Sequence, residues 1–523
     1  MTPIVAASAL FVVFYGIRNL LRRVFSVLDN LPGPPLKSMI TGNLTQFHDH
    51  EDYTGKFQRE LEQDYGQVVK LHGLFGVIHL DVTTATFTDT IFRLDNSLFS
   101  TRQRSTRSWL KIRTYTKNLR SCFGNLDQLL WGPGIFSATR DDHRKYRKIM
   151  MPAFSAANLR GMIPIFYEVA EKLDFNPILC RTSLEMIGLA GIGYSFDPML
   201  PGQEPTDRYA EALKQLMPAV FKMALILPVL PFIFETFPSF FLRFMMNLIP
   251  LPALHELRDI VDFTHATAME LVRSRKAAMG SGKLDDGGKD VMSLLMKTDA
   301  SAESGMHLTD AELAAGTSMV LFAATDTTSA AMTRMVHILA TYPDVQEKLR
   351  AEVLAVPQHL DHDTLVALPY LDGFIREILR LYPPVVSSVF REALADGVLP
   401  LTTPITGVDG RLIESIFVPK GTTVHIGIPA ANHSKRIWGD DALEFKPERW
   451  TNGKANSVTT KLCGVYGNTM TFIGGGRSCI GFKFAQLEMT PVTRVQWRNT
   501  GIMLTPHVND RPELPIVVER LKA

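Results

Sequence analysis

The chain has 523 residues, yet no linker divides it into the roughly three domains that this length suggests at about 150 residues each. Hydrophobic residues make up 46% and charged residues 21%, which is ordinary for a globular enzyme. The 55 basic and 53 acidic residues nearly cancel, so the charge gives no indication of nucleic-acid binding. No C-x-x-C pair is present, which disfavours a zinc site or a disulfide framework and fits a reducing compartment. The cysteines are Cys122, Cys180, Cys463 and Cys479.

The N-terminal segment MTPIVAASALFVVFYGI carries no charge and is followed by Arg18, Arg22 and Arg23. A cleaved signal peptide would carry its positive charges before the apolar stretch. The segment is at the short end of what spans a bilayer, and positive residues after it place the following chain in the cytosol. We expect residues 1–29 to form a single-pass membrane anchor and residues 30–523 to form one catalytic domain. A buried helix that caps the domain is the alternative.

After this segment, LPGPPLK at residues 31–37 predicts a stiff elbow, because proline fixes the backbone and glycine permits a turn. Residues 53–64 suit a helix. Residues 66–81, GQVVKLHGLFGVIHLD, suit a pair of strands joined by a glycine-containing turn. Most of the remaining chain reads as helices, so the predicted fold is mainly α with a smaller β part (α+β).

Residues 207–256 are strongly apolar, but six prolines and several charges interrupt them, which disfavours a second membrane span. An irregular helical hairpin that dips into the lipid surface is the preferred interpretation, and a pair of buried core helices is the alternative. The segment 280–290, GSGKLDDGGKD, is expected to be flexible and exposed.

The clearest helix begins with a capping box formed by Thr309 and Glu312. Its apolar pattern continues without a proline to Tyr342, before Pro343. At about 1.5 Å per residue the helix would be roughly 50 Å long and would cross an entire domain.

Polar residues interrupt the middle of this helix, in FAATDTTSAA at 322–331. Asp326, Thr327 and Thr328 would cost free energy in a buried helix unless they are hydrogen-bonded or functional. A threonine that bonds back to the preceding turn explains the pattern as well as a functional role does.

Cys479 lies in the glycine-rich stretch TFIGGGRSCIGFKFA, residues 471–485. A buried packing thiol, a redox thiol and a metal ligand are all compatible with a single cysteine. A packing thiol does not need so many glycines, each of which costs about 1 kcal/mol in regular structure. FKFAQLEM then reads as a helix start, whose backbone amides would favour the thiolate form. A thiolate beside a flat anionic ligand is what ligation of a haem iron requires.

The stretch FIGGGRSCIG matches the F-x-x-G-x-R-x-C-x-G signature of the cytochrome P450 superfamily. Phe472, Gly475, Arg477, Cys479 and Gly481 are all in register. A match of this length with every signature residue in place is highly specific.

Other motifs follow the order that this superfamily has. EILR holds Glu377 and Arg380 and resembles its E-x-x-R helix, while FKPERW supplies Arg449 as the third member of a structural triad. The elbow at 31–37 and DDHRKYRKIMMPAFS at 141–155 extend the resemblance over nearly the whole chain. The chain is most similar in style to membrane-bound fungal members, which implies the cytochrome P450 fold with a long central helix over a haem.

The resemblance implies haem b (iron protoporphyrin IX) as cofactor, with Cys479 as the axial ligand of the iron. Phe472 would shield the sulfur, and Gly475 and Gly481 would let the backbone approach the ring. Arg477, Arg147 and Arg391 are similar to residues that bind the haem propionates, and His143 stands where many relatives have Trp. Glu377, Arg380 and Arg449 would form a buried network that fixes the cysteine loop.

Asp326 and Thr327 would deliver protons during oxygen activation. Electrons would come from NADPH through a separate cytochrome P450 reductase, because no G-x-G-x-x-G follows a strand. A basic face for that reductase, or an ordinary solvated face, would contain Arg144, Lys145, Lys148 and Lys483. The implied location is the endoplasmic reticulum membrane, with the catalytic domain in the cytosol.

The implied activity is hydroxylation or oxidation of a lipophilic small molecule, for which we expect a terpenoid secondary metabolite. Two alternatives remain: a catalytically impaired, membrane-tethered haem or lipid binder, and a haem-thiolate isomerase or dehydratase that needs no electrons. Ala324 replaces a glycine that relatives usually have. The chain also looks short before Cys180 and after Met489, where little room is expected for a helix and a strand.

Overall fold

Helices predominate over strands in the computed structural model, which confirms the predicted fold class. The chain forms two compact units. Unit 1 comprises residues 1–114, 385–444 and 455–478, and unit 2 comprises residues 115–384, 445–454 and 479–523. The structure describes residues 27–47, 55–73, 78–82, 112–113, 130–138, 140–155, 158–159, 161–162, 178–197, 208–222, 244, 246–280, 290–300, 308–356, 362–386, 390–393, 395–451, 462–489, 496–499 and 504–507.

Unit 1 is built on a five-stranded sheet of order β1-β2-β7-β4-β3. β2 pairs with β1 in antiparallel and with β7 in parallel orientation, while β4 is antiparallel to β7 and to β3. The predicted strand pair at 66–81 is confirmed by β1 and β2, in which Val68 lies opposite Val82. The strands are β1 (Val68–His72), β2 (Ile78–Val82), β7 (Thr423–Ile426), β4 (Phe390–Ala393) and β3 (Ile112–Arg113).

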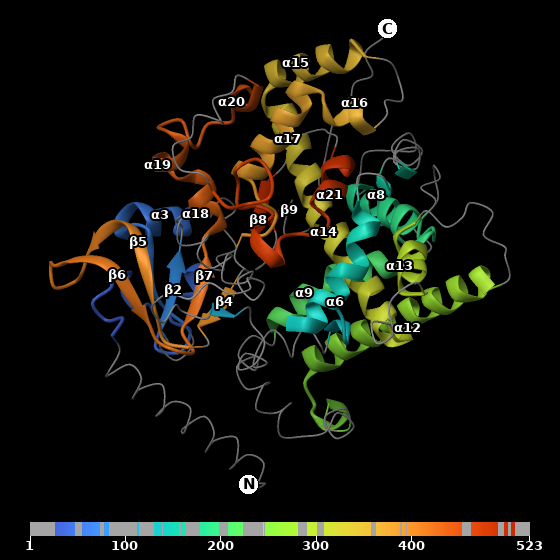
Figure 1. Cartoon of the computed structure of the whole chain (residues 1–523), viewed down its shortest axis with the longest axis horizontal. Coiled ribbons are helices and arrows are strands. Elements are labelled where there is room, and N and C mark those ends of the chain that lie inside the picture. Colours follow the sequence, from blue (N-terminus) through green and yellow to red (C-terminus); the bar gives the residue numbers. More distant parts are fainter. Residues whose placement is uncertain are drawn as a thin grey trace, which may run out of the picture. The chain divides into compact units, whose positions relative to one another are not determined.

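A separate antiparallel hairpin and several short helices complete the described part of unit 1 (Figure 1). The hairpin consists of β5 (Gly397–Thr406) and β6 (Leu412–Val418). The helix predicted at 53–64 is α3 (Lys56–Tyr65), which buries Leu61 toward Val69 and Leu71. The other helices are α2 (Leu44–Phe47), α18 (Ile428–His433) and α19 (Lys435–Trp438).

Unit 2 is mainly helical. Its long helices are α6 (Arg140–Met150), α8 (Ile178–Ile187), α9 (Tyr209–Lys222), α12 (Pro252–Gly280), α13 (Val291–Ala300), α14 (Asp310–Thr341), α15 (Pro343–Leu354) and α17 (Pro369–Leu381). Shorter helices are η3 (Met151–Phe154), a π-helical turn η4 (Gly188–Ile192), α16 (His362–Val366), α20 (Glu448–Thr451) and α21 (Phe482–Glu488).

The C-terminal part of unit 2 corrects one expectation. Helix α21 is short, as expected, and contains seven residues. A strand pair nevertheless follows it, because β8 (Gln496–Asn499) and β9 (Leu504–His507) pair in antiparallel orientation. The prediction that little room remains for a strand after Met489 was therefore wrong. The segment before Cys180 that looked short lies largely outside the described residues.

Helix α14 is the central element of unit 2 and confirms the predicted long helix. It contains 32 residues, so it is about 48 Å long. The capping box is present: the Glu312 amide donates to Thr309 Oγ1 over 3.2 Å, and the Thr309 amide donates to Glu312 Oε2 over 2.6 Å. α14 packs against α8, α12, α15, α17 and α21 (Figure 1). Most of its side chains are buried, which explains why its pattern is apolar on all sides.

The apolar region at 207–256 is only partly described. Within it, α9 packs against α12 and buries Leu213, Leu216 and Val220, so this part is a core helix, as the alternative interpretation had it. Phe244, Leu248 and Leu251 are exposed. The predicted contact with lipid stays a prediction.

The predicted membrane anchor falls almost entirely on residues 1–26, which lie outside the described part of the chain, as does most of the segment 280–290. Among the residues that the structure describes, we find no helix that is both long enough and apolar enough to cross a bilayer.

Replacing Thr309 by Ala tests the capping box of α14. The substitution removes the side-chain acceptor of the Glu312 amide, so we expect the free energy of unfolding to fall by about 1 kcal/mol. Urea unfolding followed by circular dichroism measures this change. Thr267→Ala on the exposed face of α12 is the matched control, since it removes a hydroxyl in mid-helix and should change stability by less than about 0.5 kcal/mol. Equal losses in the two variants would contradict the role of the cap.

Candidate functional site

The cysteine loop is a tight turn that leads directly into a helix. Residues Gly475–Arg477 form one 3-10 turn, closed by the Ser478 amide, which donates to the Gly475 carbonyl over 3.1 Å. Gly475 has a φ of 71°, a left-handed conformation that residues with a Cβ rarely adopt. α21 begins at Phe482, with Gly481 at its N-cap. The predicted helix start after the cysteine is therefore present.

The Cys479 thiol experiences opposing electrostatic effects. Its pKa is raised above the usual value because burial outweighs the two effects that lower it, a hydrogen bond from the Gly481 backbone amide and the charge of Arg147. The side chain is nevertheless exposed. The two observations agree if the thiol borders an internal space. The pKa depends on how much protein surrounds the sulfur, whereas the exposed fraction depends on whether there is room directly beside it. Donors that stabilise an anionic sulfur next to open space suit a metal ligand better than a packing thiol.

Two of the predicted cofactor-binding residues lie on α6, one turn apart. His143 is buried, and Arg147 is half-buried, so burial lowers the pKa of Arg147 while the Cys479 charge raises it. Their spacing of four residues places both side chains on one face of the helix. The structure therefore brings Arg147 into electrostatic contact with Cys479, as a propionate-binding or thiolate-stabilising cation requires.

The remaining predicted cofactor residues belong to unit 1, apart from Gly481. Phe472 is half-buried and meets the Tyr466 ring edge to face, at 5.8 Å between the ring centroids. Arg477 ends the 3-10 turn and is half-buried. Arg391 is buried on β4, where it lies opposite Val424 of β7. At Gly481, an added Cβ would meet no atom within 4 Å, so space is open beside the backbone next to Cys479.

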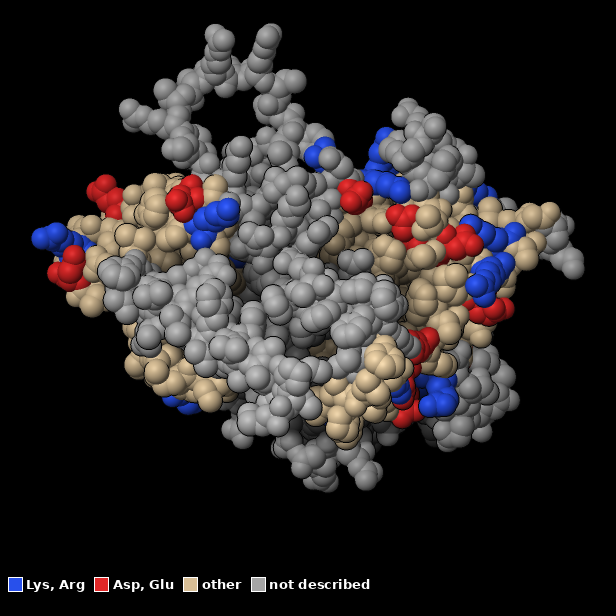
Figure 2. Space-filling view, turned by 90° about the horizontal axis from the view of Figure 1, so that it is seen from below, with Lys and Arg blue, Asp and Glu red and all other residues tan. Residues whose placement is uncertain are grey.

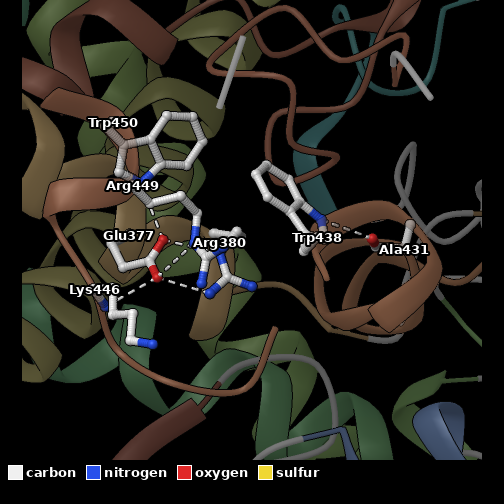
Figure 3. A network of polar contacts seen from close by, with 7 residues as sticks. All are labelled: Glu377, Arg380, Ala431, Trp438, Lys446, Arg449 and Trp450. Atoms are coloured by element: carbon white, nitrogen blue, oxygen red, sulfur yellow. Dashed lines mark hydrogen bonds and ion pairs between the residues drawn. The ribbon is translucent and has the colours of Figure 1, made fainter. Parts of the chain in front are cut away.

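The three predicted triad residues form one buried network in unit 2 (Figure 3). Arg380 donates to the Glu377 carboxylate through Nε over 2.9 Å and through Nη2 over 2.7 Å, and Arg449 Nε lies 3.4 Å from Oε1. Glu377 and Arg380 are both fully buried. The bidentate geometry between them is the arrangement in which a guanidinium compensates a buried carboxylate best.

Two further donors complete this network. The Lys446 backbone amide donates to Glu377 Oε1 over 3.1 Å, and the Trp450 indole N–H donates to Oε2 over 3.0 Å (Figure 3). Sequence reasoning missed both, although Lys446 and Trp450 belong to the same FKPERW segment as Arg449. Helix α17 approaches this segment closely, because a Cβ at Gly373 would lie 2.8 Å from the Pro447 carbonyl oxygen.

The middle of α14 has one face that is not closed off by protein. Phe322, Ala323, Ala324, Asp326 and Thr327 are half-buried there, whereas the residues on either side are buried. Thr327 Oγ1 donates to the Ala323 carbonyl over 2.6 Å. The hydroxyl therefore bonds to the preceding turn of the helix, which is the structural alternative that the sequence analysis left open. The hydroxyl oxygen can still accept a hydrogen bond.

Burial raises the pKa of Asp326 to about 6, although the nearby Lys214 ammonium opposes the shift. A carboxyl group with such a pKa can take up and release protons near neutral pH. Lys214, on α9, is a neighbour that the sequence did not reveal, because 112 positions separate it from Asp326.

These residues fit a haem. Within unit 2, the Cys479 sulfur accepts a hydrogen bond from the Gly481 amide, lies near the Arg147 charge and borders open space. The half-buried face of α14 adds small residues together with the acid Asp326 and the alcohol Thr327. A cysteine thiolate is one of the axial ligands that proteins use for haem iron.

Comparison with known proteins identifies the family. The family model for cytochrome P450 matches residues 226–494. Cytochrome P450 monooxygenase 91 of Postia placenta is 38% identical and covers 98% of both chains. This chain belongs to the cytochrome P450 family. Relatives of this kind carry a haem iron and act as monooxygenases, so the chain is a cytochrome P450 monooxygenase and an oxidoreductase.

Other relatives agree with this assignment. Ganoderic acid synthetase CYP5150L8 of Ganoderma lucidum is 36% identical over 92% of this chain and 88% of its own. Among solved structures, retinoic acid bound cyanobacterial CYP120A1 matches with a TM-score of 0.60 and 22% identity, over 88% of this chain and 90% of that one. The structural match shows the P450 fold.

The residues of the predicted basic face have different surroundings. Lysine and arginine side chains alternate with acidic ones over the described surface in Figure 2. Lys145 lies 3.6 Å from Glu312 and is mostly buried, and Lys483 lies over the Phe482 ring. Arg144 and Lys148 are exposed on α6. A docking role for these residues stays a prediction.

Replacing Glu377 by Gln tests the buried network. The substitution leaves the buried Arg380 guanidinium without a counter-charge, so we expect a loss of about 3 to 5 kcal/mol in the free energy of unfolding. The control is Glu347→Gln, which removes an exposed carboxylate that pairs with Arg350 on α15 and should cost less than about 1 kcal/mol. Denaturant titration of both full-length variants gives the comparison. A small, similar loss in both would show that Glu377 does not hold the network together.

Proposed function

We propose that this cytochrome P450 binds haem b through Cys479 and uses O2 and NADPH-derived electrons to hydroxylate or oxidise a lipophilic small molecule. The observation that carries this proposal is the placement of the Cys479 sulfur beside open space, where the Gly481 amide and the Arg147 charge favour the thiolate and oppose the effect of burial. Arg477, Arg391 and His143 are proposed to bind the haem propionates together with Arg147. Phe472 shields the sulfur, and Gly475 and Gly481 leave room for the ring.

When bound, the haem supplies the activation of O2 that inserts one oxygen atom into substrate. The protein's contribution is to move protons and exclude water. Asp326 receives protons near neutral pH because its pKa is about 6, and Thr327 can pass them on once its hydroxyl leaves the Ala323 carbonyl. Glu377, Arg380 and Arg449 keep the segment around them in place without contacting substrate.

A separate NADPH-cytochrome P450 reductase is the proposed electron donor, since the chain has no dinucleotide-binding fingerprint of its own. Residues 1–29 are proposed to anchor the protein in the endoplasmic reticulum membrane, with the domain at 30–523 in the cytosol. The apolar segment at 1–17, followed by three arginines, supports this location.

The proposed substrate is a terpenoid. The half-buried face of α14 presents Phe322, Ala323 and Ala324, and Phe322 packs against Trp131 with ring centroids 4.7 Å apart. Apolar walls of this kind favour a lipophilic molecule. Feeding candidate terpenes to microsomes that contain the protein and a reductase, with mass spectrometry of the products, tests this choice.

The alternatives without external electrons have less support. An isomerase or dehydratase does not need a carboxyl group whose pKa lies near neutrality on the open face of α14, and a binding protein does not need it either. Asp326 therefore favours a monooxygenase that consumes protons.

Cys479→Ser tests the axial ligand. A serine oxygen cannot replace the thiolate, so the reduced protein with carbon monoxide should lose the red-shifted Soret band, and product formation should fall at least about 100-fold. Cys463→Ser, at a half-buried cysteine of unit 1, is the control and should keep the band. An unchanged spectrum in Cys479→Ser would refute the assignment.

Thr327→Ala and Asp326→Asn test proton delivery. Both should raise the amount of peroxide released per NADPH, and Asp326→Asn should also remove the pH dependence of coupling around pH 6, where Asp326 changes charge. The control is Thr325→Ala, because Thr325 makes the same type of back-bond, to Leu321 over 2.6 Å, but is fully buried. If Thr325→Ala uncouples as strongly as Thr327→Ala, the protons take another route.

A further inference from the structure

Glu488, the last residue of α21, is a buried carboxyl group that the proposed reaction does not use. It exposes 1% of its surface. Both carboxyl oxygens are buried, and neither makes a hydrogen bond of good geometry within the described residues. A carboxylate in such a place costs several kcal/mol unless a cation compensates it, so the ionised form is strongly disfavoured.

The surroundings of Glu488 come from three helices of unit 2. Its neighbours Phe484 and Leu487 belong to one apolar cluster with Leu184 of α8 and Leu321 of α14. The hydroxyls of Ser183 on α8 and Thr328 on α14 face the carboxyl group. Both residues are buried. These hydroxyls are the polar groups that a neutral carboxylic acid, with one donor and one acceptor, can satisfy.

The charged groups on these helices do not compensate a negative charge at Glu488. Arg181 of α8 binds Asp197, and Lys483 of α21 lies over the Phe482 ring. The titratable groups Glu185 of α8 and Asp326 of α14 are themselves acidic. Burial is the largest influence and raises the pKa of Glu488 well above its usual value, and only the two hydroxyls oppose this shift.

The site connects to the oxygen-activating turn of α14. Thr328 directly follows Thr327 in the chain, and Ser183 Oγ donates to the Ala324 carbonyl over 3.1 Å. Ala324, Asp326 and Thr327 share the half-buried face of α14. A group that holds both Thr328 and Ser183 therefore acts on the backbone that carries the acid and alcohol pair.

We propose that Glu488 is a positioning residue that stays protonated and joins the helix after Cys479 to the turn of α14 that carries Asp326 and Thr327. Its function in coupling rests on the proposed monooxygenase function. A neutral acid can bond to both hydroxyls at once. An ionised one would place an uncompensated charge between three packed helices and push them apart.

The first test compares the stability of the full-length wild type and Glu488→Gln as a function of pH. The folded state binds the Glu488 proton more tightly than the unfolded state, so the stability that Glu488 contributes is present at low pH and is lost as pH rises above about 4.5. Glutamine is neutral at every pH. We expect equal stability at low pH and a growing advantage for Glu488→Gln at higher pH, by up to about tenfold in the unfolding constant per pH unit. Parallel pH profiles would overturn the proposal.

Glu185→Gln is the matched control. Glu185 is also buried, on α8, but its carboxylate accepts hydrogen bonds from Ser195 Oγ over 2.6 Å, from the Phe196 amide over 2.9 Å and from the Asp197 amide over 2.8 Å. A glutamine presents an N–H₂ group where an acceptor is needed, so this variant should be less stable than the wild type at neutral pH. Burial raises the pKa of both carboxyl groups, but the hydrogen bonds at Glu185 oppose this shift, so at neutral pH the same substitution is expected to have opposite effects on stability at the two sites.

The second test separates positioning from simple space filling. Glu488→Ala should release more peroxide per NADPH than the wild type, and Glu488→Gln should restore most of the coupling. Equal uncoupling in both variants would contradict the proposal. The stability profile does not depend on haem binding or turnover. A protein that shows the pH effect but no thiolate spectrum would therefore refute the proposed function while leaving the protonated Glu488 intact.

Discussion

The proposed function requires a negative charge on the Cys479 sulfur, inside protein that opposes this charge, and the rest of the site depends on that requirement. Burial acts against the charge, while the Gly481 amide and Arg147 favour it. The sequence around the cysteine follows from this need. Gly475 permits a left-handed turn before the sulfur, and the start of α21 supplies the amide after it. Arg147 must be delivered by α6, more than 300 positions earlier in the chain.

The second buried anion, Glu377, is stabilised in a different way. Two guanidinium groups, a backbone amide and an indole N–H surround its carboxylate, so the charge is compensated instead of being held ready for reaction (Figure 3). Glu488 represents a third solution, in which the carboxyl group is neutral. On the proposed assignments, one unit contains a reactive thiolate, a structural carboxylate and an uncharged acid, and the neighbouring donors distinguish them.

Short sequence motifs correctly predicted those elements whose formation depends on neighbouring residues. The capping box of α14, the strand pair β1 and β2, and the helix start after Cys479 all depend on residues a few positions apart. The E-x-x-R and FKPERW motifs indicated the triad residues through resemblance. The proximity of Lys214 to Asp326 and of Glu488 to Ser183 and Thr328 could not be predicted, because it depends on how helices distant in sequence pack. The strand pair after Met489 was missed because Pro491 suggested an early end of regular structure.

The close approach at Gly373 has a consequence for how the protein tolerates change. A methyl group there would strike the Pro447 carbonyl, three positions before Trp450 and next to Lys446. Any larger residue would clash with this backbone and push α17 away from the segment that bonds to Glu377. A substitution of Gly373 would therefore displace the donors around Glu377 from a distance, without altering any residue proposed to bind the haem.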